Sequence, residues 1–323
     1  MTLLKRKSKL IVILGPTASG KSDLAIKLAQ QFNGEIVSAD SRQIYQEMNI
    51  GTAKPFLIRN SKFKINKKGK VIIINNIPHY LIDIIKPNQE FNVAIYKKLA
   101  LKTIREIQKR GKIPFLVGGT GLYLAAVIKN IKFPQVPPQK ELRKKLEKKS
   151  ISELFKIYKK LDPEGIKFIE KENKRRLIRA IEVSKVTKKP FWKQRKKGRQ
   201  LFEILQIGIK PSKERLKKKI IQRVKKMFQL GLEKEVKKLV KKYGWPTSLQ
   251  TIGYQEWQKF FTKEIDRKEV EKLIIQHTLQ FAKRQMAWFS SQINLENKKT
   301  KEIYWVKNKK EAEYLIKEFI KNK

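Results

Sequence analysis

Apolar runs along the chain predict alternating strands and helices. The run KLIVILG at residues 9–15 is continuous and rich in β-branched residues, which is typical of a strand buried on both faces. Further runs of this kind lie at residues 34–40, 71–85 and 112–121. Between them, residues 21–32 and 90–111 have the spacing of helices with one apolar face. This alternation predicts an α/β fold with a parallel sheet flanked by helices.

Local details refine this pattern. The helix expected over residues 90–111 would end at Gly111, and its predicted core stripe consists of Phe91, Ile95, Leu99, Leu101 and Ile104. The segment 60–74 predicts a small hairpin with its turn at Gly69. Pro78 is expected to break the apolar stretch in which it lies.

The character of the chain changes after residue 130, where FPQVPPQ reads as a Pro-rich linker. A very basic segment of helical pattern follows, and KPFWKQRKKGR looks like an exposed loop. The run LFEILQIGI then predicts that the sheet resumes. We therefore expect residues 1–130 and 200–323 to form a core like that of the P-loop NTPases, and residues 131–199 to form an inserted helical domain. Later helices are expected at 212–230, 232–243, 269–289 and 310–320, with a strand at 302–306.

The segment GPTASGKS, between the first strand and the first helix, has the spacing of a phosphate-binding loop. Backbone N–H groups at the start of a helix can surround an anion, Lys21 would bind outer phosphate oxygens, and Ser22 could hold Mg²⁺. The predicted phosphate site comprises Gly15, Pro16, Thr17, Ala18, Ser19, Gly20, Lys21 and Ser22.

A hydrolysing NTPase normally has an apolar strand that ends in an Asp for its metal ion. Here the candidate strand ends in Gly118, Gly119 and Thr120. Asp40 instead follows the second strand, at the carboxyl edge that also carries the loop. Two interpretations of Asp40 stay open: a base that takes a proton from a nucleophile, and a cap of the next helix.

Charge and composition narrow the function classes. The 323 residues include 77 Lys and Arg against 29 Asp and Glu, a net charge of +48, which predicts a polyanionic partner such as nucleic acid. A general lysine bias is the alternative, because Lys is spread over the whole chain. With no Cys and two distant histidines, disulfides, thiol nucleophiles and zinc clusters are excluded. No apolar run approaches the ~20 residues of a membrane span, so we expect a cytoplasmic monomer that binds no membrane.

Seven motifs in order resemble those of the tRNA dimethylallyltransferase family: GPTASGKS, VSADSRQIYQEMNIGTAKP, PHYLIDI, PFLVGGTGLY, RRLIRAIEV, LQTIGYQEW and AKRQMAWF. The resemblance covers residues 11–289. It implies transfer of a dimethylallyl group from dimethylallyl diphosphate to N6 of the adenosine that follows the anticodon on its 3′ side. The loop would then hold the donor's diphosphate and Mg²⁺, and the partner would be the anticodon stem-loop of a tRNA.

The resemblance also implies roles for single residues. Asp40 would be the base, Lys21 and Thr17 would act in the loop, and Arg223 would reach the diphosphate; without the resemblance, Arg223 and the RRLIR arginines read as solvated helix residues. The implied tRNA-binding residues are Asp40, Ser41, Arg42, Gln43, Thr120, Arg143, Arg175, Arg176, Leu177, Ile178, Arg179, Gln250, Thr251, Ile252, Gly253, Tyr254, Gln255, Lys283, Arg284 and Gln285. Because the target base must leave its stack, nearby aromatics such as Tyr45, Phe191, Trp192 and Tyr254 could replace the lost stacking.

The chain departs from the family pattern at three places. Ser290 and Ser291 stand where the family commonly has an arginine, segment 60–74 is longer than usual, and KPFWKQRKK replaces small polar residues. The alternatives are a prenyltransferase for free AMP, ADP or ATP, a nucleotide kinase, and an ATP-driven nucleic-acid-binding protein. The RRLIRA motif, the basic insertion and the net charge favour an RNA acceptor.

Overall fold

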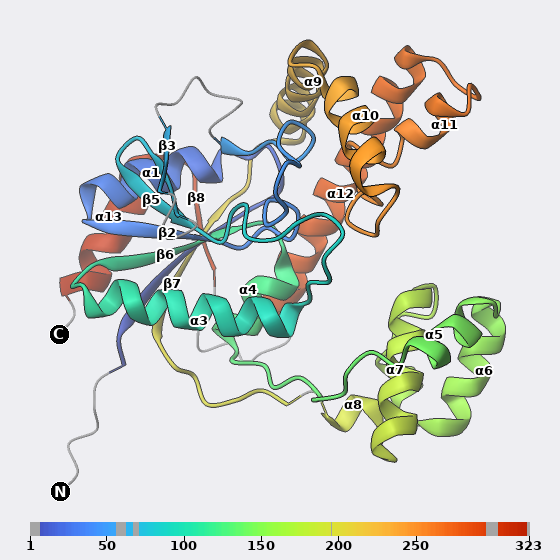
Figure 1. Cartoon of the computed structure of the whole chain (residues 1–323). Helices are drawn as coiled ribbons and strands as arrows, with labels where there is room; N and C mark the ends of the chain where they lie inside the picture. The colour runs from blue at the N-terminus through green and yellow to red at the C-terminus, as the bar shows by residue number, and fades with distance from the viewer. Residues whose placement is uncertain (1–6, 56–62, 67–70, 195, 295–302, 322–323) are drawn as a thin grey trace, which may run out of the picture. The chain divides into compact units, whose positions relative to one another are not determined.

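The computed structural model describes residues 7–55, 63–66, 71–194, 196–294 and 303–321. The chain divides into two compact units (Figure 1). The first unit combines Met1–Val127 with Leu201–Lys323, and the second is Ile128–Gln200. Within the described ranges, no helix has both the length and the apolar character needed to cross a membrane.

Among the described residues of the first unit, eight strands form one sheet in the order β3-β4-β5-β2-β6-β1-β7-β8. Every neighbouring pair from β5 to β8 in this order is parallel, whereas β3, β4 and β5 form an antiparallel meander. The strand bounds are β1 Lys9–Leu14, β2 Gly34–Ser38, β3 Phe63–Asn66, β4 Val71–Ile74, β5 Ile77–Tyr80, β6 Ile113–Gly118, β7 Glu203–Ile209 and β8 Tyr304–Val306. The predicted fold class is confirmed.

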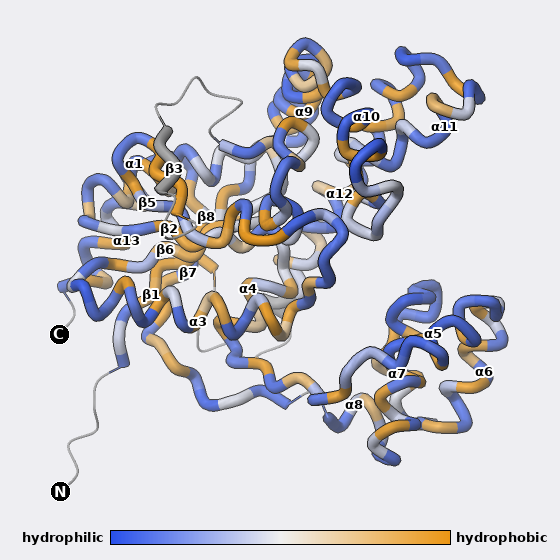
Figure 2. The backbone as a smooth tube through the Cα atoms, viewed as in Figure 1, coloured by the Kyte–Doolittle hydropathy of each residue, from blue (hydrophilic) through white to orange (hydrophobic). Residues whose placement is uncertain are grey.

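Helices cover both faces of this sheet, which explains why β1 is apolar throughout. Ile11 and Ile13 belong to a core cluster with residues of α1 (Lys21–Gln31) and α13 (Lys309–Lys321). On the opposite face lies α3 (Val93–Lys109), followed after β6 by α4 (Gly121–Ile128) (Figures 1 and 2).

The buried face of α3 differs from the predicted stripe. Its buried residues are Tyr96, Ala100, Thr103, Ile104 and Ile107, whereas Ile95 is 41% exposed. The helix begins after Asn92, whose side chain accepts hydrogen bonds from two backbone N–H groups of the first turn. The buried stripe includes Tyr96, which was not part of the predicted stripe.

The expected hairpin is present as the antiparallel pair β3–β4, and Gly69 lies outside the described residues. A second hairpin was missed. Asn75 and Asn76 form a two-residue turn between β4 and β5, with φ of 49° and 65°, the sign that such hairpin turns require. Pro78 therefore lies within β5 and does not break it, since β5 pairs with β2 only from His79 onward.

In the described part of the first unit, the remaining helices are α9 Lys213–Gln229, α10 Leu232–Tyr243, α11 Trp257–Phe261 and α12 Arg267–Asn294. Trp257 is fully buried among aromatic rings that include Phe228 and Phe261. The helices predicted at 212–230 and 232–243 are confirmed to within one residue, and Gly231 and Gly244 flank α10. The helix α12 extends beyond the predicted 269–289 at both ends, and α11 was not predicted.

The second unit is helical: α5 Lys140–Glu147, α6 Ile151–Leu161, η1 Gly165–Lys167, α7 Lys174–Thr187 and α8 Phe191–Gln194. Its core contains Leu146, Leu154, Tyr158, Leu177 and Ile181. The segment expected to be a loop after residue 189 thus begins with the short helix α8.

Candidate active site

The phosphate-binding loop joins β1 to α1, and its backbone requires its glycines. Gly20 precedes α1 with φ of 92°, a conformation that other residues adopt with strain. A Cβ on Gly15 would lie 2.8 Å from the carbonyl oxygen of Ile209 on the adjacent strand. The Nζ of Lys21 donates to the carbonyl of Pro16 at 3.1 Å, so the ammonium folds back over the loop.

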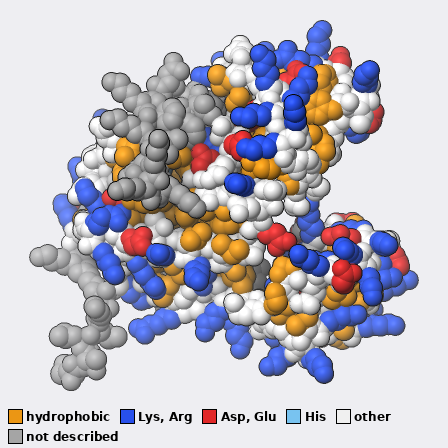
Figure 3. All heavy atoms as spheres, in the orientation of Figure 1, with side chains coloured by type: hydrophobic (Ala, Val, Ile, Leu, Met, Phe, Trp, Pro, Cys, Tyr) orange, Lys and Arg blue, Asp and Glu red, His pale blue; other side chains and the backbone are white. Residues whose placement is uncertain are grey.

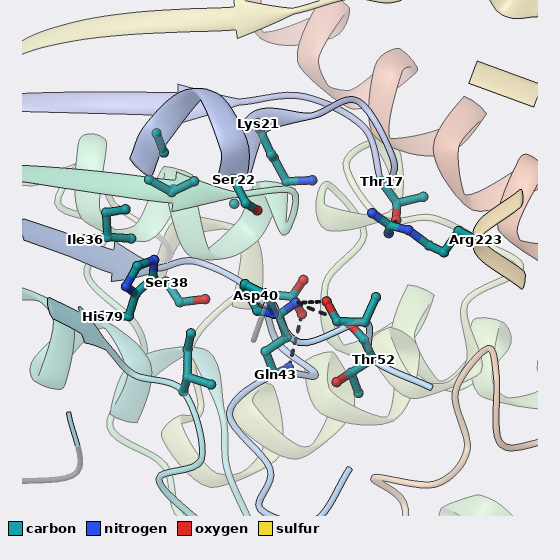
Figure 4. A pocket seen from close by; sticks show the side chains of 16 residues that line it. Thr17, Lys21, Ser22, Ile36, Ser38, Asp40, Gln43, Thr52, His79 and Arg223 are labelled. Atoms are coloured by element: carbon teal, nitrogen blue, oxygen red, sulfur yellow. Dashed lines mark hydrogen bonds between the residues drawn. The ribbon is translucent and has the colours of Figure 1, made fainter. Parts of the chain in front are cut away.

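One pocket brings together the residues expected to bind the donor and the expected base. Thr17, Lys21 and Ser22 line it from the loop, Asp40 and Gln43 from the segment after β2, and Arg223 from α9 (Figure 4). The same pocket has apolar lining from Ala25, Ile36, Pro55, Ile82 and Val117.

Asp40 caps the turn that follows it. Its Oδ1 accepts hydrogen bonds from the backbone N–H groups of Arg42 at 2.8 Å and Gln43 at 3.3 Å. The neighbouring Ser41 N–H donates to Thr120 Oγ1 at 3.1 Å, and Thr120 N–H donates to the Ala39 carbonyl at 3.2 Å. Asp40 therefore both caps a turn and faces the pocket, and the two interpretations left open by the sequence are compatible.

Thr17 connects the loop to two C-terminal helices. Arg223 on α9 donates from Nη1 to Thr17 Oγ1 at 3.0 Å. Gln285 on α12 accepts from Thr17 N–H at 2.8 Å and donates to the Gly119 carbonyl at 2.8 Å. Gln285 is 7% exposed, so its amide ties the loop to the end of β6. Its side chain is not presented to an RNA, contrary to the expectation.

Lys54 of the IGTAKP motif was not singled out, yet it anchors the segment behind Asp40. It is completely buried and donates to the Tyr45 carbonyl at 2.7 Å, to Asn49 Oδ1 at 2.8 Å and to Asp83. Burial lowers the pKa of Lys54 and raises the pKa of Asp83, while their pairing opposes both effects. The ion pair joins two of the family-like motifs.

Glu235 on α10, which the sequence analysis did not identify, holds residues 49–51 of the segment that follows Asp40. Its carboxylate accepts from the backbone N–H groups of Asn49, Ile50 and Gly51 at 2.8–3.1 Å, and from the Tyr254 hydroxyl at 2.7 Å. Three successive N–H groups form a typical anion-binding concavity, filled here by the protein's own carboxylate.

Two of the predicted tRNA-binding residues are consequently structural. Tyr254 is fully buried, and its ring lies where a Cβ on Gly51 would be. Burial raises the pKa of Tyr254, and the adjacent Glu235 carboxylate adds to this effect. Gly253 packs on Gly51, and its N–H donates to Glu256 at 2.9 Å. The aromatic ring of Tyr254 is therefore not available to replace a flipped base.

In the second unit, most of the RRLIR motif is also structural. Leu177 and Ile178 lie in the core of the unit. Arg143 donates from Nε and Nη2 to the fully buried carboxylate of Glu182 at 2.7 and 2.8 Å, and Arg179 donates to Glu182 at 2.5 Å and to the Val136 carbonyl at 2.9 Å. Burial alone would raise the pKa of Glu182, but these bonds outweigh it and hold the pKa below its ordinary value.

The other predicted tRNA-binding residues lie at least partly on the surface. Gln250, Lys283, Arg284 and Arg175 are exposed, whereas the remaining predicted contacts are partly buried: Ser41, Arg42, Thr120, Arg176, Thr251, Ile252 and Gln255. Lys283 and Arg284 adjoin Gln285 on α12, so this helix has a cationic outer side and a polar anchor to the phosphate loop. The side chain of Trp288, also on α12, is partly buried against Gly121.

A mostly parallel sheet with a glycine-rich loop after its first strand, and with Lys21 and Arg223 at one pocket, defines the architecture of a P-loop protein. The chain matches the profile of the family described as IPP transferase over residues 43–292, and that of isopentenyl transferase over residues 8–71. The chain belongs to the tRNA dimethylallyltransferase family, a family of prenyltransferases.

Individual relatives agree with this membership. A tRNA dimethylallyltransferase of Microcystis aeruginosa is 43% identical over 88% of this chain and 86% of its own length. One from Halothermothrix orenii is 42% identical over 96% of this chain and 94% of its own. The crystal structure of the tRNA isopentenylpyrophosphate transferase from Bacillus halodurans matches with a TM-score of 0.67 and 32% identity, covering 97% of each chain.

Proposed function

We propose that the protein transfers a dimethylallyl group from dimethylallyl diphosphate to N6 of the adenosine next to the anticodon of a cytoplasmic tRNA, on its 3′ side. The supporting observation is that Asp40 faces the phosphate-binding loop across a single pocket, in a chain of this family. Diphosphate is the second product.

The donor's diphosphate would bind the N–H groups of the loop, with Lys21 and Arg223 as its cationic partners. When the allylic C–O bond breaks, negative charge grows on the departing oxygen, and these positioned donors stabilise it. The Ser22 hydroxyl lines the same pocket and suits the oxygen preference of Mg²⁺, which would neutralise diphosphate charge when bound. The apolar residues Ala25, Ile36, Ile82 and Val117 would contact the five-carbon chain.

The acceptor amine would approach from the Asp40 side. The new bond joins the allylic carbon to N6, the C–O bond breaks toward the diphosphate, and Asp40 accepts one proton from nitrogen. Because N6 of a stacked adenine is out of reach, the base must leave its stack to enter the pocket. Thr120 and the cap at Asp40 keep the carboxylate in place while the proton moves.

The rival function is prenylation of free AMP, ADP or ATP, which would share the donor site. The two are separated by incubating the protein with dimethylallyl diphosphate, Mg²⁺ and either an anticodon stem-loop, AMP or ATP. Mass spectrometry should show the gain of a five-carbon group on the stem-loop alone. Modification of a free nucleotide without modification of RNA would refute the proposal.

Salt dependence supplies a second test. A stem-loop held by 6–10 phosphate contacts should lose about 10³–10⁵-fold in affinity between 50 and 200 mM salt. A free mononucleotide makes few such contacts, so its affinity should change far less. A flat response for the stem-loop would contradict binding along an RNA backbone.

A further inference from the structure

The second unit displays an aromatic pair on its surface that the proposed chemistry does not use. Phe168 directly follows η1 and is 59% exposed. Its ring stacks on Trp192 of α8, with centroids 5.1 Å apart and planes inclined by 30°. Single exposed apolar residues are ordinary, but here the partly buried Trp192, whose Nε1 is a buried atom, supports one side of the Phe168 ring and fixes its orientation.

The pair is held in place by buried polar groups. The Trp192 backbone N–H donates to Asp162 Oδ2 at 3.3 Å. Asp162 is 1% exposed and is itself fixed by the Tyr158 hydroxyl and the Gly165 N–H, both at 2.9 Å. The pair is therefore positioned before any ligand arrives, which lowers the ordering cost of binding.

Both cations and carboxylates lie near these rings. The Lys193 ammonium lies 5.4 Å from the centroid of the Trp192 ring. Arg176 donates to the Phe168 carbonyl at 3.4 Å, and the exposed Lys167 and Lys171 flank Phe168 in the chain. Glu164 pairs with Lys167, and the exposed Glu170 and Glu172 on either side of Lys171 offset more of this charge, so Lys193 and Arg176 are the cations that the rings retain. Lys and Arg greatly outnumber Asp and Glu in the unit as a whole, and Figure 3 shows such cations over much of the visible surface.

We propose that Phe168 and Trp192 form a stacking platform for an unpaired base of the RNA acceptor, with Lys193 on the adjoining phosphate. This inference rests on the proposed function for the identity of the RNA. Aromatic faces flanked by cations are typical of single-stranded nucleic-acid sites, because every base offers a π-face and every nucleotide a phosphate. A protein partner fits less well, since the cations around the rings would need an equally acidic surface.

The first test measures the affinity of a fluorescently labelled anticodon stem-loop by anisotropy. Phe168→Ala should weaken binding by about 5- to 150-fold, the usual range for the loss of one stacked base. No charge is removed, so the slope of log affinity against log salt should match the wild type. Lys193→Ala should lower the magnitude of that slope by about 0.7–0.9, one phosphate contact. Phe168→Tyr should keep the affinity.

Val186→Ala is the matched control, because Val186 is 47% exposed on α7 of the same unit. It should leave the affinity unchanged, and circular dichroism should show that each variant folds. Trp192 is the sole tryptophan of residues 128–200. The fluorescence lost in Trp192→Phe should therefore be the component that the stem-loop quenches.

The second test places single abasic sites along the RNA loop. At the nucleotide that stacks, the abasic RNA should bind wild type and Phe168→Ala with equal affinity, whereas other positions should keep the difference. If Phe168→Ala binds every RNA like the wild type, the platform is refuted even though the wild type prenylates RNA. If the variant instead changes the oligomeric state at unchanged RNA affinity, the surface is a protein interface and the inference is wrong. Absence of RNA prenylation by the wild type would refute the proposed function itself.

Discussion

Asp40→Asn separates the two roles that the structure gives to Asp40. The cap uses Oδ1, which accepts from Arg42 and Gln43. Asparagine keeps an oxygen at this position, so the turn after β2 should form as before. It cannot take up a proton from an amine at neutral pH, so the proposed base is lost.

The two roles predict effects of very different size. A missing general base lowers the rate by about 10²–10⁴-fold, which corresponds to about 3–5 kcal/mol in the activation barrier. A retained cap leaves stability nearly unchanged. Asp40→Ala removes both roles and should also cost about 0.5–2 kcal/mol of stability, the range for a lost cap. For a unit of this size that is a fall in Tm of a few degrees, at about 2–4 °C per kcal/mol.

The decisive assay is a single turnover with enzyme in excess over a labelled stem-loop and saturating donor. Under these conditions the rate reports the chemical step, and anisotropy under the same conditions reports RNA affinity. Asp40→Asn should turn over at least about 100-fold more slowly, with wild-type Tm and RNA affinity. If the rate stays within a few-fold of the wild type, the carboxylate is a cap and not the base. A variant with weakened RNA affinity but a normal rate at saturating enzyme would likewise remove Asp40 from the base role.

Three further predictions address the surrounding residues. Lys21→Ala should weaken Mg²⁺-diphosphate binding in calorimetry by about tenfold or more, because one charge-assisted bond is worth about 1.5–3 kcal/mol; unchanged binding would place the anion elsewhere. Glu235→Ala should lower the free energy of unfolding by about 2–4 kcal/mol in urea, because three backbone N–H groups and the Tyr254 hydroxyl lose their acceptor, whereas Tyr254→Phe should cost less than half of this. The depressed pKa of Glu182 contributes stability above its ordinary value of about 4.5, and this stability is lost as pH falls through the lower folded pKa. Urea unfolding followed by far-UV circular dichroism should therefore depend less on pH below 4.5 in Glu182→Gln, and an unchanged profile would contradict this account.

The sequence located the centre of the site because that centre depends on local rules. A strand, a glycine loop and a helix follow one another in GPTASGKS, and the carboxyl ends of parallel strands meet at one edge. These rules place Lys21 and Asp40 at the same edge without knowledge of the remaining chain. The pocket that contains both residues follows from them.

The supporting residues could not be assigned in this way, because a motif does not say whether its members touch a ligand or each other. Gln285 and Thr17 are 268 residues apart in sequence, and Glu235 is 184 residues from Gly51. Their pairing depends on how α10 and α12 pack on α9. A charged residue within a family-like motif, such as Lys54, could have indicated a buried ion pair. Its partner Asp83 lies in another motif, so the sequence does not show which carboxylate it meets. The resemblance to the family therefore pointed to these motifs, but it could not separate residues that hold the fold together from residues that contact a ligand.

The end of β6 explains why Asp40 is the carboxylate of this site. A Cβ on Gly118 would lie 2.2 Å from the Ala39 carbonyl oxygen, and one on Gly119 would lie 2.4 Å from Gln285 Nε2. An aspartate at the strand end, where hydrolysing NTPases hold their metal ion, would displace the segment that carries Asp40. The glycines instead let the Ala39 N–H donate to the Val117 carbonyl at 2.7 Å. Of the described residues that line the pocket, Asp40 alone bears a carboxylate; it lies just after β2, the strand next to β6, and faces the loop. The close packing of Gly118 and Gly119 thus leaves no room for an aspartate at the end of β6. The same packing holds the segment that carries Asp40, the proposed base, at the carboxyl edge of the sheet.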